Sequence, residues 1–168
     1  MRDGSDDEYV EYVAARVPAL RRLAYVLTGD GHRADDLVQQ TITTLYVKWQ
    51  RARNADNLDA YVRTMLIRTF VDERRLAWAK VRLFRDTPEP APVVESGTED
   101  REVIRAALRR LPRRQRAVLV LRFFYDLSVD EVARSLDCSP GTVKSHTSRG
   151  LAALRGQLGV RALAGHTP

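Results

Sequence analysis

The chain has 168 residues, of which 44% are hydrophobic and 30% are charged, and its formal net charge is +6. This composition excludes a disordered polypeptide and allows one domain or two small ones, while the lack of any apolar run near the ~20 residues of a membrane span argues against membrane insertion. The single cysteine, Cys138, cannot form an internal disulfide and the three histidines are scattered, so we predict a cytoplasmic protein without a metal or cofactor.

The first predicted helix begins after Ser5, a candidate N-cap that is followed by three acidic residues at the positive end of the helix dipole. Apolar residues then recur at three- and four-residue steps as far as Leu27, which is the pattern of an amphipathic helix. We expect Pro18 to bend this helix or to split it in two. The Gly-Asp-Gly sequence at residues 29–31 should end it.

The second predicted helix covers residues 33–49 and has two contrasting faces. One is an apolar stripe that ends at Trp49. The opposite face is acidic and polar, with no lysine before Lys48. Its residues are Asp35, Asp36, Gln39, Gln40, Thr43 and Thr44. Such a face is either simply solvated or suited to docking on a basic partner.

A polar turn at residues 54–57 precedes the third predicted helix. The core side of this helix consists of Leu58, Tyr61, Val62, Met65, Leu66, Thr69 and Phe70. The outer side and the segment that follows are basic, with Arg63, Arg68, Arg74, Arg75, Lys80, Arg82 and Arg85. We predict that residues 5–85 form the first domain.

Residues 86–98 contain three prolines, one glycine, three acidic residues and no basic one, which indicates an extended, flexible linker. A capping box, Ser96 with Glu99, then opens the next helix. Its expected inner face consists of Val103, Ile104, Ala107, Leu108 and Leu111. A further helix over residues 113–125 follows. We predict that residues 99–160 form the second domain.

Residues 127–155 have the pattern of a helix, a tight turn and a second helix. Ser139 can serve as N-cap and Pro140 occupies the first helical position. Val143 and Gly150 fall on the side facing the first helix, whereas small polar and cationic residues face outward, as a helix that enters the DNA major groove requires. An ordinary helical hairpin is the simpler alternative. Cys138 fits a small turn residue better than a redox sensor.

No period-two pattern occurs, so the predicted fold is all-α, with two small helical domains, a flexible linker and a C-terminal helix-turn-helix. At this level the chain resembles a bacterial RNA polymerase sigma factor of the extracytoplasmic-function group, within the sigma-70 superfamily. The resemblance rests on Asp-Gly-His-Arg-Ala-Asp-Asp-Leu-Val-Gln-Gln-Thr at residues 30–41, on residues 111–124 and on Ser-Pro-Gly-Thr-Val-Lys-Ser at residues 139–145.

The resemblance implies that the protein binds core RNA polymerase, through a basic clamp coiled coil and the flap of the large subunits, and promoter DNA. The implied polymerase-binding residues are Asp35, Asp36, Gln39, Gln40 and Thr43. The residues implied to meet the −10 element are Lys48, Arg53, Asn54, Asn57, Arg63, Arg68, Arg74 and Arg75. Trp49 or Tyr61 could stack on a flipped base, with core packing as the alternative. Arg68 departs from the Asn that is common in the family, so it fits a phosphate contact better than a base contact.

The helix after Ser139 corresponds to the reader of the −35 element. The implied contacts are Ser139, Thr142, Lys144, Ser145, His146, Ser148 and Arg149, with Ser139 and the helix N-terminus suited to a phosphate. His146 either reaches the DNA or flanks it. We expect Arg113, Arg114, Arg116 and Arg122 to steer the domain toward the DNA backbone.

The remaining inferences concern partners and alternatives. The acidic linker either threads toward the RNA exit path, as in the family, or is a plain tether. Many relatives are held by an anti-sigma factor, although this sequence identifies none. A stand-alone helix-turn-helix regulator is the main alternative. A nuclease is disfavoured because Asp35 and Asp36 point about 100° apart on a helix, so no catalytic residue is predicted.

Overall fold

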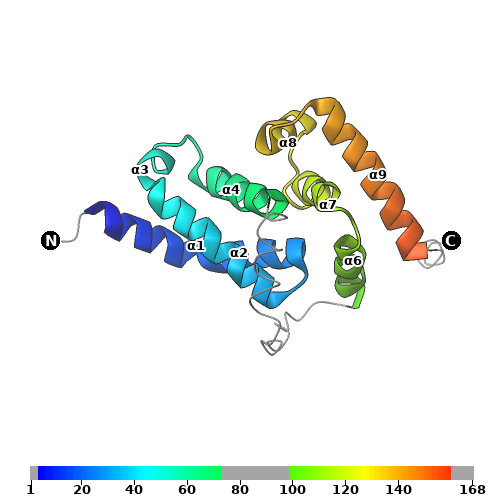
Figure 1. The fold of residues 1–168 in the computed structure, drawn as a ribbon, viewed down its shortest axis with the longest axis horizontal. Coiled ribbons are helices and arrows are strands. Elements are labelled where there is room, and N and C mark those ends of the chain that lie inside the picture. The colour runs from blue at the N-terminus through cyan, green and yellow to red at the C-terminus, as the bar shows by residue number, and fades with distance from the viewer. Residues whose placement is uncertain (1–3, 73–98, 160–168) are drawn as a thin grey trace. The chain divides into compact units, whose positions relative to one another are not determined.

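The structure, a computed structural model, describes residues 4–72 and 99–159. Across these two ranges the chain is helical and contains no strand, which confirms the all-α prediction (Figure 1). The chain divides into two compact units, Met1–Pro92 and Val93–Pro168. The predicted linker at residues 86–98, the predicted cap at Ser96, and the basic residues Arg74 and Arg75 lie outside the described residues.

The first unit is built on the long helix α1 (Gly4–Thr28). This helix already includes Ser5, so the predicted N-cap at Ser5 is wrong. The Ser5 hydroxyl instead accepts a hydrogen bond from Gln50 Nε2 at 2.7 Å. The helix is not split at Pro18. A proline removes only one backbone hydrogen bond, and contacts on both sides of Pro18 hold α1 in place. It ends as predicted, before Gly29 at φ 67°.

Helix α2 (Gly31–Val47) packs against α1 and begins with an Asp30 N-cap, whose Oδ1 accepts from the Arg33 backbone N–H at 3.0 Å. The predicted helix over residues 33–49 is too long at its end, because Trp49 belongs to a separate short helix, α3 (Trp49–Ala52). The predicted apolar stripe is nevertheless buried. Its buried members are Ala34, Leu37, Val38, Thr41, Leu45 and Trp49.

Helix α4 (Leu58–Asp72) completes the first unit and packs on α2 and α1. Asn57 caps its start, with Oδ1 accepting from the Ala60 backbone N–H at 2.9 Å. The buried residues of α4 are Val62, Leu66, Ile67 and Phe70. Ile67 was not expected in the core, and four residues that were expected there, Leu58, Tyr61, Met65 and Thr69, are only half-buried.

The second unit contains α6 (Glu99–Arg109), α7 (Arg113–Leu119), a π-helical turn η1 (Val120–Phe124), α8 (Val129–Leu136) and α9 (Pro140–Leu158). The inner face predicted for α6 is partly wrong, because Val103 and Ile104 are 51% and 42% exposed. The buried residues of α6 are Ala107 and Leu108, in its C-terminal part. The predicted helix over residues 113–125 is present, although it ends in the wider turn of η1, which leaves Phe123, Phe124 and Tyr125 exposed.

Candidate protein-docking and DNA-binding surfaces

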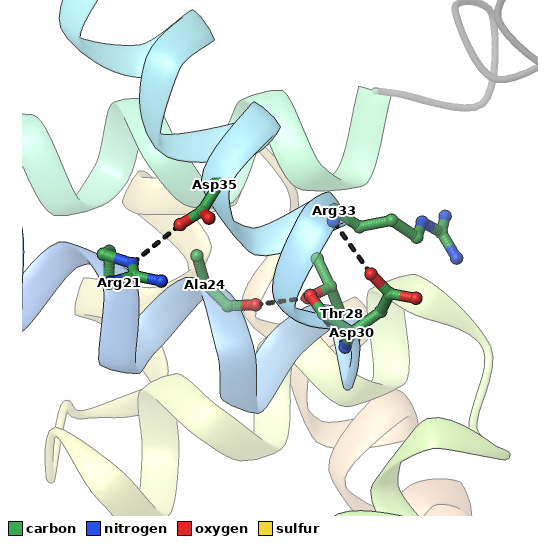
Figure 2. A network of polar contacts seen from close by, with 6 residues as sticks. All are labelled: Arg21, Ala24, Thr28, Asp30, Arg33 and Asp35. Atoms are coloured by element: carbon green, nitrogen blue, oxygen red, sulfur yellow. Dashed lines mark hydrogen bonds and ion pairs between the residues drawn. The ribbon is translucent and has the colours of Figure 1, made fainter. Parts of the chain in front are cut away.

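The outward face of α2 presents Asp36, Gln39 and Thr43 to solvent, with Gln40 half-buried. Asp35 is turned toward α1, where its Oδ1 lies 2.7 Å from Arg21 Nε (Figure 2). The two adjacent carboxylates therefore have different surroundings, as the 100° spacing of neighbouring helical residues requires. Asp35 nevertheless keeps 51% of its side-chain surface exposed, so both carboxylates remain at the surface of α2.

Sequence reasoning missed the continuation of this face toward the end of α2. Tyr46 and Val47 are 53% and 79% exposed, so one turn beyond Thr43 the polar surface becomes apolar. The available signal was a pair of large apolar residues outside the buried stripe. Thr43 contributes little donor capacity, because its hydroxyl donates to the Gln39 carbonyl at 2.8 Å.

A hollow of about 730 Å³ lies between the end of α2, the α3–α4 turn and the outer side of α4. It brings together three of the predicted −10 contacts, Lys48, Asn57 and Arg68, with Tyr61 beside them. The polar and charged residues that line it are Thr44, Lys48, Arg51, Asn57, Tyr61, Thr64, Arg68, Thr69 and Asp72. Arg51 was missed, although its place in the Arg-Ala-Arg sequence beside the turn was a usable signal. The hollow thus combines cations with amide and hydroxyl groups and one aromatic ring, the chemistry that a nucleotide requires.

Of the other predicted −10 contacts that the structure describes, Arg53, Asn54 and Arg63 do not line this hollow. Arg53 Nη2 is paired with Glu8 Oε2 at 2.6 Å, and Asn54 Nδ2 donates to the Gln50 carbonyl at 2.8 Å. Trp49 is only 5% exposed and packs edge-on against Tyr9, with ring centroids 5.5 Å apart. The stacking role considered for Trp49 is therefore wrong, since its ring belongs to the core, while Tyr61 stays available at the hollow.

In the second unit, α8 and α9 form the predicted helix-turn-helix. Ser128 and Glu131 make a reciprocal capping box at the start of α8, and Asp137 ends that helix in the left-handed conformation at φ 51°. Ser139 caps α9 as predicted, with its Oγ accepting from the Thr142 backbone N–H at 3.1 Å. The Ser139 and Thr142 hydroxyls also bond to each other at 2.9 Å.

The outward face of α9 exposes Lys144, Ser145, Ser148 and Arg149, four of the predicted −35 contacts. Val143 and Gly150 are buried on the inner side, as predicted. Thr142 is half-buried, and its hydroxyl is bonded to the cap.

His146 is likewise half-buried. Burial, with the positive charges of Arg114 and Arg149, lowers the pKa of His146 below its usual value. The imidazole is therefore neutral near pH 7, and its Nδ1 is buried without a hydrogen-bond partner. These surroundings fit the flanking role better than a charged phosphate contact.

Two of the arginines expected to steer toward DNA instead hold the second unit together. Arg116 is buried, and its Nη2 donates to the carbonyls of Arg109 at 2.6 Å and Leu111 at 2.9 Å. Arg122 Nη1 donates to the Leu127 carbonyl at 2.6 Å. Both side chains satisfy carbonyls in the connections between helices, and a guanidinium is well suited to this because it carries five donors. Arg114 is exposed and remains a candidate for steering.

Two helical units, the second ending in a helix-turn-helix whose reading face is cationic and polar, define a DNA-binding transcription protein. The comparisons with known proteins narrow this class. Residues 12–80 match the family described as Sigma-70 region 2, and residues 101–154 match Sigma-70, region 4.

Relatives of known name match across most of the chain. The RNA polymerase sigma-E factor of Streptomyces coelicolor is 36% identical over 162 residues, 93% of this chain and 89% of that protein. The ECF RNA polymerase sigma factor EcfG of Rhodopseudomonas palustris is 32% identical over 147 residues, 85% and 81% of the two chains. A solved structure of the sigma factor RpoE from Bartonella quintana, in complex with the anti-sigma factor NepR, matches with a TM-score of 0.70 and 27% identity over 90% of this chain and 96% of that one.

The chain belongs to the ECF group of RNA polymerase sigma factors. It is a subunit that binds core RNA polymerase and directs promoter recognition and transcription initiation. Among residues 4–72 and 99–159, no cluster of histidine, cysteine and carboxylate side chains is suited to a metal ion. None of the helices in these two ranges combines the length and the apolar character needed to cross a bilayer.

Proposed function

We propose that this sigma factor docks on the polymerase through Asp36, Gln39, Gln40 and Thr43 of α2, and that Tyr46 and Val47 extend the contact. Support comes from their shared exposed face, with polar groups giving way to an apolar end. A basic coiled coil would pair with the first part and cover the second. Burial of the apolar end would stabilise the complex, because each Å² of apolar surface removed from water contributes about 25 cal/mol.

The docking proposal is tested with Asp36→Lys combined with Gln39→Lys, measured by co-purification of the full chain with core polymerase. We expect association to be abolished. Glu11→Lys is the control, since Glu11 is exposed on α1 and this reversal of charge falls outside the docking face. Undiminished association of the double variant would contradict the docking face.

We propose further that the hollow beside α4 receives single-stranded promoter DNA at the −10 element. The observation that supports this most strongly is the joining of Lys48, Arg51 and Arg68 with Asn57 and Tyr61 around one space. A base drawn out of the duplex needs a ring face and polar edges, and the strand on either side of it needs cations. The −35 element would be read by Lys144, Ser145, Ser148 and Arg149, and the protein would act in the cytoplasm with the polymerase.

Permanganate footprinting of promoter opening by the reconstituted holoenzyme tests the hollow. Lys48→Ala and Arg68→Ala should each lower the fraction of open promoter while leaving polymerase binding intact. The control is Arg22→Ala, because Arg22 is an exposed cation on α1 away from the hollow. Normal opening by the Lys48 and Arg68 variants together would rule out the proposed site.

The exposed aromatic residues Phe123, Phe124 and Tyr125 support a protein contact for the second unit. We propose that the polymerase flap covers them in the holoenzyme and that an anti-sigma factor competes for the same surface. A photo-crosslinking amino acid at position 124 should couple to a large polymerase subunit, whereas the same group at the exposed position 101 should not. Equal crosslinking from both positions would contradict a specific contact.

A further inference from the structure

The N-terminal half of α1 contributes no buried residue to the hydrophobic core. The buried residues of α1 are Leu20, Leu23, Ala24, Leu27 and Thr28, all in its second half. Of the described residues before Leu20, none is buried. Pro18 lies at the boundary between the two halves, where the missing backbone N–H weakens the helix locally. The first half therefore needs other contacts to keep its place.

Four polar side chains on one face of this half, those of Ser5, Glu8, Tyr12 and Arg16, contact the segment from α3 to the start of α4. Ser5 accepts from Gln50 Nε2 at 2.7 Å, and Glu8 pairs with Arg53 at 2.6 Å. One helical turn further, two groups converge on the carboxylate of Asp59. They are the Tyr12 hydroxyl at 2.8 Å and Arg16 Nη2 at 2.7 Å.

Aromatic rings fill the space between these polar contacts. Trp49 of α3 lies between Tyr9 and Tyr12, with ring centroids at 5.5 and 5.7 Å. The Tyr9 hydroxyl donates to the Ile42 carbonyl at 2.6 Å. Burial and the hydrogen bond to Asp59 raise the pKa of Tyr12, so its hydroxyl keeps the proton that it donates. Both aromatic packing and polar contacts therefore hold this face of α1 in place.

These contacts hold both ends of one turn. Arg53 stands at the beginning of the turn over residues 53–57, and Asp59 follows it in the first turn of α4. Asn57, between them, lines the hollow and caps α4. A shift at either end would therefore move Asn57 relative to the other residues that line the hollow.

We infer that the N-terminal half of α1 is a brace that positions the turn over residues 53–57 for promoter DNA, with Glu8, Tyr12 and Arg16 as positioning residues. This inference rests on the proposed role of the hollow. Arg53 is then part of the brace, through its ion pair with Glu8. Its effect on DNA binding is indirect, because it fixes the position of the turn and makes no phosphate contact of its own. Because the core begins at Leu20, loss of the brace leaves the first unit folded.

The pair Glu8 and Arg53 offers a charge-swap test in the full-length holoenzyme. We expect Glu8→Arg and Arg53→Glu each to lower the rate of promoter opening by about fivefold, the upper range of one exposed ion pair. The double reversal should restore the rate, because the pair is re-formed in the opposite sense. If Arg53 touched DNA itself, the double variant would remain defective, which would overturn the brace.

Further variants separate a brace from a merely structural role. Polymerase affinity should stay at the wild-type value in all Glu8 and Arg53 variants, and each variant should unfold in one cooperative transition with a melting temperature only slightly below that of the wild type, since one exposed ion pair contributes little to the free energy of unfolding. A fall in polymerase affinity or the loss of that cooperative transition would overturn the inference. Tyr12→Phe removes only the hydroxyl that reaches Asp59, and it should slow opening without unfolding the chain. Glu11→Arg, exposed and outside the contact face, is the control. Wild-type opening by the Tyr12 and Glu8 variants would likewise overturn the brace.

Failure of the brace is distinguishable from failure of the hollow. Lys48→Ala removes a cation that lines the hollow itself, whereas Glu8→Arg acts on the turn through Arg53. If it slows opening while Glu8→Arg does not, the hollow stands and the brace is wrong. If neither variant slows opening, the proposed role of the hollow is wrong, and the brace falls with it.

Discussion

Gly150 of α9 lies directly against Leu119 of α7, and a Cβ atom added at position 150 would stand 2.9 Å from Leu119 Cδ1 and 3.1 Å from its Cγ. Both residues are buried. The glycine therefore allows the recognition helix to approach α7 closely, which sets how far its outward face projects from the second unit.

The contact predicts opposite effects of two Gly→Ala changes in the same helix. Gly150→Ala should destabilise the second unit by about 1–3 kcal/mol through overpacking, partly offset by the better helix propensity of alanine. Gly156→Ala, where no atom lies within 4 Å, should stabilise it by about 0.5–1 kcal/mol. Urea denaturation of the full chain, followed by circular dichroism, measures both. Equal effects of the two changes would contradict the close approach.

Arg149 should carry sequence specificity at the −35 element. Arg149→Ala is expected to weaken binding of the holoenzyme to its cognate −35 sequence by about 1–3 kcal/mol if the side chain makes a bidentate base contact. Competition binding on cognate and altered −35 sequences gives the measurement. Arg155→Ala, an exposed arginine in the last turn of α9, is the control. An equal loss on every sequence would indicate a phosphate contact instead.

Arg116 should contribute to stability and not to DNA binding. Arg116→Met keeps the aliphatic stem but leaves the carbonyls of Arg109 and Leu111 without their donor, at a cost of about 2–3 kcal/mol in unfolding free energy. Arg114→Met, at an exposed position, should cost far less. Chemical denaturation compares the two variants. A stable Arg116→Met protein with weakened DNA affinity would restore the steering role expected from the sequence.

His146 should make stability fall in mild acid. Because its folded pKa is lowered, the unfolded chain binds the proton first as the pH drops through the usual histidine value of about 6.5. Stability is therefore complete above that pH and decreases below it, down to the folded pKa. Replacement His146→Gln should reduce this acid sensitivity. Melting temperatures of the wild type and of His146→Gln, measured across this pH range, test the prediction. Parallel curves for the two proteins would contradict the lowered pKa of His146.

The sequence alone determined the helical class, the helix-turn-helix and the family, because these depend on local patterns. The spacing of apolar residues predicted the buried stripe of α2. Local sequence likewise predicted that Ser139 caps α9 and that α1 ends before Gly29. The exposed cationic face of α9 also followed from helical periodicity, since Val143 and Gly150 on the opposite side are buried. Residues near one another in sequence were sufficient for these inferences.

The tertiary structure decided which of the polar residues are already engaged within the protein. Arg53 and Glu8 are separated by most of α1 and all of α2, and no periodicity joins them. The same holds for Arg21, which pairs with Asp35, and for Arg116, whose guanidinium donates to two carbonyls. A sequence shows that a side chain can carry charge or donate a hydrogen bond, but only packing between distant segments determines whether an internal partner has taken that capacity.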